Sequence, residues 1–183
     1  MDNIKTREFI LESAAMLVQE GGAERLTLDD VATAAGLSPD TVGDHFPDLE
    51  SLVMAMVEQM VSSFHDAVAQ ACGDDESPGS WLRAYVRTGF ERDGKGDVSR
   101  IARALLSTTQ YRLQFVDSVR EREVEIQDRI NRSGLAPERG IVIRAAMEGI
   151  FLSRMLGIEL IPTNLRESVE AELLALTDPG GAA

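Results

Sequence analysis

The sequence is poor in cysteine, histidine and aromatic side chains, and each scarcity excludes a class of protein. Its one cysteine, Cys72, can form neither a disulfide within the chain nor a multi-cysteine metal site. His45 and His65 are the only histidines, and no local motif supplies a base that would activate Cys72. The sequence also lacks a phosphate-binding loop and a dinucleotide fingerprint. We therefore predict no catalytic residue, no metal site and no cofactor, and hence no enzyme.

Basic side chains are also few. Lysine and arginine number 18 against 31 acidic residues, which gives a net charge of −13 and long-range repulsion of polyanions. The most apolar stretch, 141–161, contains four charged side chains, so it is not predicted to span a membrane. The first residues lack the apolar core of a signal peptide. We expect a cytoplasmic protein with no membrane partner.

Alanine, leucine, valine, isoleucine and methionine are plentiful and recur at helical spacing. Hydrophobic residues make up 44% of the chain and aromatic residues only 5%, a balance that suits helix-on-helix packing. Apolar spacing and glycine or proline breaks predict helices over about 4–20, 28–35, 39–46, 49–72, 78–92, 98–107, 109–132, 137–156 and 164–176. No segment alternates like a strand, and we predict an all-helical protein.

Residues 26–52 have the pattern of a helix-turn-helix followed by the start of a long helix. Thr27 is a predicted N-cap, Gly36 lets the chain reverse, and Ser38 precedes Pro39 as the start of the second short helix. Two short helices joined by a glycine-containing turn can place the second helix in a DNA groove. The turn alone fits a generic helical hairpin equally well.

The wider segment 7–53 resembles the N-terminal domain of the TetR (tetracycline-repressor-like) family of transcriptional regulators. The residues that carry the resemblance are Arg7, Ile10, Leu11, Ala14, Ala15, Leu17, Gly21, Gly22, Leu26, Thr27, Val31, Ala32, Ala35, Gly36, Leu37, Ser38, Thr41, Val42, His45, Phe46 and Leu52. The resemblance implies a three-helix DNA-binding domain, 1–48, joined by a long helix to a C-terminal helical domain, 49–183, for dimerisation and ligand binding. It further implies a homodimeric regulator, acting as a repressor, whose partners are operator DNA and an unidentified small-molecule effector.

Hydroxyl, imidazole and guanidinium groups of this segment could donate to phosphates or bases. These candidate DNA contacts are Arg7, Thr27, Ser38, Thr41 and His45.

Four positions depart from the family's pattern in a way that weakens DNA binding. Gly43 stands where the family commonly has an aromatic residue and Leu49 where it commonly has a lysine, and by the resemblance both family residues contact phosphates. Asp40 replaces a small residue, and Asp44, four residues later, shares its helix face.

The predicted DNA-binding third is also the more acidic part of the chain. Residues 1–55 contain three basic side chains (Lys5, Arg7 and Arg25) and eleven acidic ones, a formal charge of −8. DNA affinity depends on basic groups that neutralise phosphates, so this charge reverses the expected pattern. Two explanations stay open. The aspartates are simple solvated surface, or the acidic head does not bind DNA and acts through a protein partner, such as a basic regulator that it antagonises.

The helix predicted at 137–156 is apolar on nearly every side, so it should bury one face in its own core and another against a partner chain. We predict a four-helix homodimer interface. Its candidate residues are Ile143, Ile150, Arg154, Leu165, Val169 and Leu173.

A ligand pocket could be lined by aromatic and methionine side chains with arginine for selectivity. The candidates are Trp81, Tyr85, Arg103, Tyr111, Phe115, Arg144, Met147 and Phe151. The same spacing is typical of plain core. A buried Arg144 requires a partner, which could be a ligand or Glu148 one helical turn away.

Overall fold

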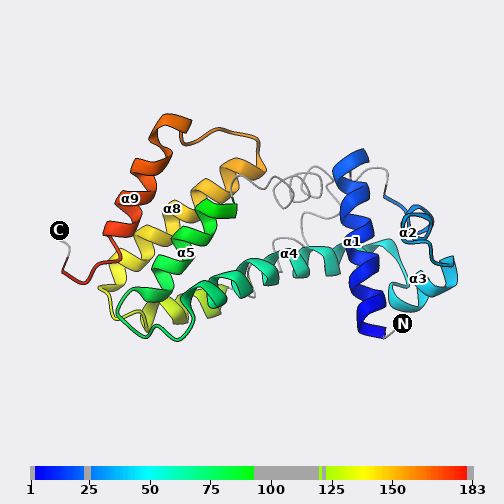
Figure 1. Cartoon of the computed structure of the whole chain (residues 1–183), viewed down its shortest axis with the longest axis horizontal. Coiled ribbons are helices and arrows are strands. Elements are labelled where there is room, and N and C mark those ends of the chain that lie inside the picture. The colour runs from blue at the N-terminus through cyan, green and yellow to red at the C-terminus, as the bar shows by residue number, and fades with distance from the viewer. Residues whose placement is uncertain (1–2, 23–25, 93–119, 121–122, 181–183) are drawn as a thin grey trace. The chain divides into compact units, whose positions relative to one another are not determined.

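The computed structural model describes residues 3–22, 26–92, 120 and 123–180, and within these ranges it contains helices and turns but no strand (Figure 1). The prediction of an all-helical protein is confirmed. The described residues divide into two compact units, one ending at Val61 and the other beginning at Ser62. This division falls inside one long helix, α4 (Leu49–Cys72). The boundary predicted between residues 48 and 49 coincides with the start of α4 and, as a domain boundary, stays a prediction.

The first unit contains α1 (Asn3–Gly21), α2 (Leu28–Ala35), α3 (Pro39–His45) and the first part of α4. In sequence order, α1 packs against α2, and α2 packs against α3. The apolar spacing of each helix directs one face into a shared core, which accounts for most of the stability that such short helices have. The fully buried large side chains are Ile10, Leu11, Val31, Val42, Phe46, Leu52, Val53 and Val57.

Side-chain caps fix where the short helices begin and end. Thr27 accepts a hydrogen bond from the Asp30 N–H at 3.1 Å and so caps α2, as predicted. Gly36 ends α2 with a φ of +63°, in the left-handed region that favours glycine. At the start of α4, Asp48 Oδ1 accepts from the Ser51 N–H at 2.7 Å.

The second unit contains the end of α4, α5 (Ser80–Glu91), α8 (Pro137–Met155), the 3₁₀ turn η3 (Thr163–Leu165) and α9 (Arg166–Ala175). Residues 123–131 are also helical. Both α8 and α9 pack against α5. Their core consists of Val68, Leu82, Ala84, Tyr85, Val86, Phe90, Ile130, Ile143, Met147, Ile150 and Leu173.

Two glycines let helices of this unit approach closely. A Cβ added at Gly89 of α5 would collide with Met147 Cε, and one added at Gly140 of α8 would collide with Ile130 Cγ2. Interiors of proteins are close-packed, so neither position has room for a side chain without a shift of its neighbour. At residue 89 the neighbour is the end of the flexible Met147 side chain, so a change of its rotamer could make room there.

The predicted helix bounds agree closely with the structure. The ranges 28–35 and 49–72 match α2 and α4, whereas 78–92 begins two residues before α5 and ends one residue after it, and 137–156 ends one residue after α8. The range 164–176 covers most of η3 and all of α9. The predicted helix 98–107 lies outside the described residues, as does the first part of 109–132. No helix in the described ranges is long and apolar enough to cross a membrane.

Candidate functional site

The helix-turn-helix is formed by α2, the turn at Gly36 and α3 (Figure 1). Leu37 donates its N–H to the Ala32 carbonyl at 2.9 Å, which closes the turn. Val42 anchors α3 because it is fully buried, whereas Pro39, Asp40 and Asp44 are exposed. One face of α3 is thus fixed to the core and the opposite face is presented to solvent, as a DNA-reading helix requires.

Two of the five candidate DNA contacts, Thr27 and Ser38, use their hydroxyl groups to cap helices, and the hydroxyl of a third, Thr41, hydrogen-bonds to that of Ser38. Thr27 Oγ1 donates to Asp30 Oδ2 at 2.6 Å while it accepts from the Asp30 N–H. Ser38 Oγ accepts from the Thr41 N–H at 3.1 Å and lies 2.7 Å from Thr41 Oγ1. The Thr27 hydrogen is therefore already donated, and the Ser38–Thr41 pair keeps one hydroxyl hydrogen that could be donated to a phosphate.

The two remaining candidates lie near the end of α3. Arg7, exposed on α1, places its guanidinium carbon 5.2 Å from the centre of the Phe46 ring, immediately after α3. His45 is half-buried, and its ring centroid lies 6.5 Å from that of Phe46. Arg7 therefore brings a positive charge to the C-terminal end of α3, which contains no lysine or arginine of its own.

The four departures from the family's pattern occupy accessible positions. Asp40 and Asp44 are exposed, and Leu49 is half-buried at the start of α4. Gly43 lies within α3 without a positive φ, and a Cβ added there meets no atom within 4 Å. Packing therefore does not require a glycine at this position, and an aromatic side chain would extend from α3 without a clash at its Cβ.

The charge of this surface is negative throughout. The chain has no lysine or arginine between Arg25 and Arg83, and Arg25 lies outside the described residues. Over α2, α3 and the start of α4, the exposed carboxylates are those of Asp29, Asp30, Asp40, Asp44, Asp48 and Glu50. Hydrogen bonds from the Ser51 backbone and side chain lower the pKa of Asp48, which keeps that carboxylate ionised. DNA phosphates would meet carboxylates here, with Arg7 as the cation beside Phe46.

Three predicted pocket residues, Trp81, Tyr85 and Met147, are packed in or against the core of the second unit. The Trp81 ring stacks on Tyr85 with centroids 5.2 Å apart, and Phe64 meets Tyr85 edge-on at 5.6 Å. Burial raises the pKa of Tyr85 to about 12, with a smaller contribution from Glu148. Among the described residues, these contacts are typical of a close-packed core. The sequence spacing fitted such a core as well as it fitted a ligand pocket.

The other predicted pocket residues are placed differently. Phe151 is 37% exposed on α8. The Arg144 guanidinium donates to Glu148 at 2.5 Å, to Gln127 at 3.3 Å and also to Glu123. Arg144 is thus paired within the protein, as the Glu148 alternative predicted. Arg103, Tyr111 and Phe115 lie outside the described residues, and the pocket as a whole stays a prediction.

Three residues predicted for the dimer interface lie in the core of their own chain. Ile143, Ile150 and Leu173 are 0%, 5% and 7% exposed, so each leaves little surface for contact with a second chain. Their place in an interface stays a prediction. Val169 is half-buried against the core, Arg154 is half-buried, and Leu165 is 47% exposed. Hydrophobic periodicity located the helix correctly but could not tell which of its apolar faces the chain itself covers.

A different apolar face of α8 is exposed. The core of the chain leaves its side chains uncovered near the two ends of the helix. The exposed apolar residues of α8 and of its C-terminal end are Ile141, Val142, Phe151, Leu152 and Leu156.

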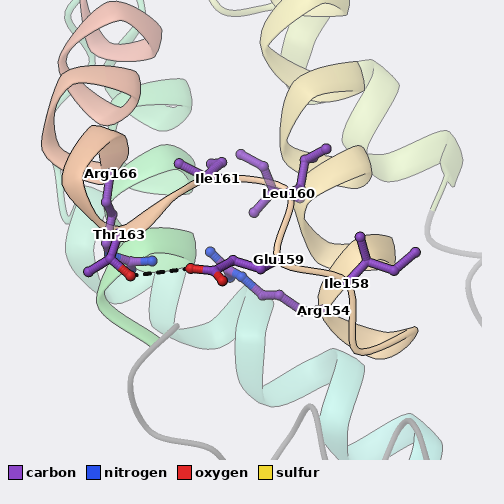
Figure 2. A pocket seen from close by; sticks show the side chains of 8 residues that line it. Arg154, Ile158, Glu159, Leu160, Ile161, Thr163 and Arg166 are labelled. Carbon is purple, nitrogen blue, oxygen red and sulfur yellow. Dashed lines mark hydrogen bonds between the residues drawn. The ribbon is translucent and has the colours of Figure 1, made fainter.

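Sequence patterns did not reveal a cavity beside α9, drawn in Figure 2. It lies between the end of α8, the connecting segment 157–162 and the start of α9, and residues such as Arg154 and Arg166 line it. Nothing in the periodicity of α8 or α9 indicates it, because half of its described lining residues come from a non-helical segment.

The two units correspond to two known domain families. Residues 10–56 match the model described as bacterial regulatory proteins of the tetR family, and residues 79–178 match the tetracyclin repressor-like C-terminal domain. The helix-turn-helix and the helical C-terminal unit thus define a helix-turn-helix type of transcriptional regulator. The chain belongs to the TetR family of transcriptional regulators, which confirms the resemblance. Members of this family are regulators and not enzymes, in agreement with the prediction.

Individual proteins resemble the chain more distantly. The HTH-type transcriptional regulator BetI of Rhizobium meliloti (strain 1021) is 23% identical over 87 residues, which is 48% of this chain and 43% of that relative. The matched part of the chain therefore spans less than half the length of this curated relative.

Solved structures share the fold over nearly the whole chain. A member of the TetR family from Streptomyces coelicolor A3 has a TM-score of 0.69 at 20% identity, and covers 92% of this chain and 97% of its own. The multidrug binding protein EbrR, in complex with imidazole, has a TM-score of 0.68 at 21% identity, with 97% and 93% covered. The fatty acid degradation regulator FadR from Bacillus halodurans has a TM-score of 0.68 at 16% identity, with 92% and 94% covered.

Proposed function

We propose that the protein is a homodimeric repressor in which α3 of each chain enters the major groove of an operator. The observation that carries this proposal is the geometry of the helix-turn-helix, with α3 anchored by Val42 and its far face exposed. A helix held in this way by a capped turn can insert into DNA without rearrangement of the core. A regulator of transcription would act in the cytoplasm.

In this proposal, DNA binding relies on few charge contacts. Arg7 beside Phe46 supplies a cation, and the Ser38–Thr41 pair supplies a hydroxyl hydrogen at the N-terminus of α3. Asp40 and Asp44 would repel phosphates, although an aspartate can accept from a cytosine amino group. We therefore expect weak DNA binding with a shallow salt dependence, because few counterions would be released.

The exposed apolar face of α8 supports the homodimer. Ile141, Phe151, Leu152 and Leu156 are 51%, 37%, 51% and 60% exposed in the single chain. An apolar strip of this kind is more typical of an interface than of a solvated surface. A twofold arrangement would place the same strip of a second chain against it and bury both. The dimer would then hold two reading heads for the two halves of an operator.

A small-molecule effector is the expected regulator of DNA binding. The C-terminal unit resembles that of EbrR, which is known in complexes with imidazole and with malachite green. An effector would act by favouring one arrangement of the two reading heads over another. The proposed pocket keeps its predicted residues, of which Arg103, Tyr111 and Phe115 come from the undescribed part of the chain.

A second candidate function follows from the carboxylates on the helix-turn-helix. Asp29, Asp30, Asp40 and Asp44 are all exposed, and α2 and α3 contain no lysine or arginine. Such a surface is complementary to a basic protein surface and favours rapid association with it at low salt. In this case the protein would bind another regulator through its basic DNA-binding face and antagonise it.

One titration separates the two candidates. The purified full chain is titrated against a DNA fragment from the region upstream of its own gene and against a scrambled fragment of equal length, at several salt concentrations. The repressor proposal expects preferential binding to the first fragment, with affinity that falls as salt rises. Absence of binding even at about 20 mM salt would overturn direct DNA recognition and leave the protein-partner function.

A further inference from the structure

A cavity of about 190 Å³ lies wholly within the second unit, between the end of α8 and the start of α9 (Figure 2). Of the predicted ligand-pocket residues that the structure describes, none lines it. For comparison, an apolar cavity of about 150 Å³ holds one benzene molecule. The space therefore suits a ligand of about seven non-hydrogen atoms.

Much of the wall is aliphatic. Its four aliphatic side chains are those of Ile150, Ile158, Leu160 and Ile161. Ile150 is 5% exposed, whereas Ile158 and Leu160 are 55% and 53% exposed. A hydrocarbon chain in this space would remove apolar surface of both ligand and protein from water, which favours binding.

Two guanidinium groups line the same cavity from different helices, Arg154 from α8 and Arg166 from α9. Arg154 Nη1 donates to the Gly89 carbonyl at 3.2 Å, and Arg166 Nη2 donates to the Phe90 carbonyl. Arg166 also lies over the Phe90 ring, 5.2 Å from its centre. These contacts with the end of α5 hold both guanidiniums in place. Each guanidinium has five N–H donors, so such contacts are compatible with a further hydrogen bond to a ligand.

Among the described residues of the wall, the one carboxylate is that of Glu159. It accepts a hydrogen bond from the Thr163 hydroxyl at 3.2 Å, and Figure 2 shows this side chain directed toward Thr163. Among the described residues that line the cavity, two side chains are positive and one is negative. Both guanidiniums would attract a carboxylate, whereas a doubly charged anion would meet stronger repulsion from Glu159.

We propose that this cavity binds a short, branched aliphatic monocarboxylate, with its carboxylate toward Arg154 and Arg166 and its hydrocarbon against the isoleucines. Guanidinium and carboxylate groups match in geometry and form strong charge-assisted hydrogen bonds. Burial also lowers the pKa of Arg154 to about 10, and a nearby anion would offset that cost of burial. A role for this ligand as the effector rests on the proposed function, but its binding does not.

The binding test uses 3-methylbutanoate, whose seven non-hydrogen atoms match the cavity, and its uncharged isostere 3-methylbutanamide. Ligand-observed NMR or calorimetry on the full chain without DNA should give saturable binding of the carboxylate, with a dissociation constant on the order of 1 mM. The amide should bind at least about tenfold more weakly, because it lacks the charge that the guanidiniums recognise. Inorganic phosphate should also bind more weakly than the carboxylate.

Matched variants locate the site. Leu160→Glu places a second carboxylate at the cavity on an exposed position, and should weaken 3-methylbutanoate binding at least about tenfold. Leu165→Glu makes the same change at a similarly exposed leucine outside the lining, and should leave the affinity within about twofold. Arg166→Lys should retain more affinity than Arg166→Gln. Circular dichroism of each variant shows whether it is folded.

Three outcomes would overturn the proposal: no saturable binding of 3-methylbutanoate, equal binding of the amide, or equal loss in the two leucine variants. Tighter binding of phosphate would also contradict it, because the aliphatic wall would then contribute nothing. These measurements contain no DNA, so a protein that binds the carboxylate but not DNA would refute the repressor function alone. A repressor that fails to bind the carboxylate would refute this site alone.

Discussion

Arg7 on α1 lies over the ring of Phe46, with its guanidinium carbon 5.2 Å from the ring centre. Phe46 itself is 2% exposed and follows the last residue of α3. One side of the ring therefore helps to form the core while the other positions a cation beside the reading helix. This contact links the packing of the first unit to the only electrostatic feature near α3 that favours DNA among its described residues.

Replacement of Arg7 by glutamine should therefore affect both stability and DNA binding. An exposed cation–π contact contributes about 0.5–1 kcal/mol, so we expect a loss of that size in the free energy of unfolding. If Arg7 also contacts a phosphate, the slope of log affinity against log salt should fall by about one. Denaturant titration and DNA binding at several salt concentrations measure the two effects.

Lys5→Gln is the matched control for Arg7, because it removes an exposed charge from the same helix and has no ring contact among those described. It should change stability by less than about 0.5 kcal/mol. An equal effect of the two substitutions on stability would show that the ring contact contributes nothing. An unchanged salt slope in Arg7→Gln would remove Arg7 from the DNA interface.

Tyr85 makes stability depend on pH under alkaline conditions. Burial raises its pKa to about 12 from the ordinary value of 10, so the folded protein keeps this proton where the unfolded chain loses it. Its contribution is complete below pH 10 and is lost as pH rises through about 12. Tyr85→Phe should therefore flatten the alkaline fall in unfolding free energy between these two values. A wild-type and a variant curve of equal steepness would contradict this assignment.

Gly36 and Gly43 form a matched pair that separates backbone conformation from space. An added Cβ meets no atom within 4 Å at either position, but only Gly36 has a positive φ, +63°. Gly43→Ala should raise the free energy of unfolding by up to about 1 kcal/mol, because alanine favours the helix. Gly36→Ala should lower it by about 1–2 kcal/mol, because alanine is strained in the left-handed region. Urea unfolding of both variants tests this, and a shift of the same sign in both would be inconsistent with it.

These residues also show how far the sequence alone reaches. Capping residues such as Thr27 and Ser38, and the breaks at Gly36 and Pro47, determine local conformation, so the helices of the first unit could be predicted within about two residues. These signals come from residues that are close together in the sequence, so they do not depend on contacts between distant segments. The same locality explains why Thr27 was predicted both as a cap and as a DNA contact, although the structure uses its hydroxyl for the cap.

Features of the second unit depend on contacts between distant segments, and there prediction was weaker. Ile143 and Ile150 are predicted for the dimer interface, but both lie in a core that includes residues of α5, which is far from α8 in sequence. The cavity beside Arg154 could not be predicted because its wall includes a non-helical segment with no periodicity. The net charge of a segment, by contrast, can be counted from the sequence alone. That count predicted the acidic surface around Asp40.

The dimer should depend on the exposed apolar face of α8. Leu152 is 51% exposed in the single chain, so Leu152→Asp leaves the core intact and places a charge in the proposed interface. Light scattering should show a shift from dimer to monomer at micromolar concentration. Val124→Asp is the control, since Val124 is 69% exposed on the helix at 123–131. A dimer that survives Leu152→Asp would refute this face, and one disrupted only by Val124→Asp would locate the interface elsewhere.

The carboxylates of α3 decide between the two candidate functions. Asp40→Asn with Asp44→Asn keeps the shape of both side chains and removes two negative charges from the exposed face of α3. If that face meets phosphates, DNA affinity should rise about tenfold or more at low salt, since each removed repulsion is worth on the order of 1 kcal/mol at an exposed site. Asp74→Asn with Asp178→Asn makes the same change in net charge at exposed positions of the second unit, and should raise affinity much less.

Equal gains in the two double variants would mean that only net charge matters and that α3 does not contact DNA. Loss of specific binding in the α3 variant would instead identify an aspartate as a base contact, because asparagine cannot replace a carboxylate that accepts two hydrogen bonds.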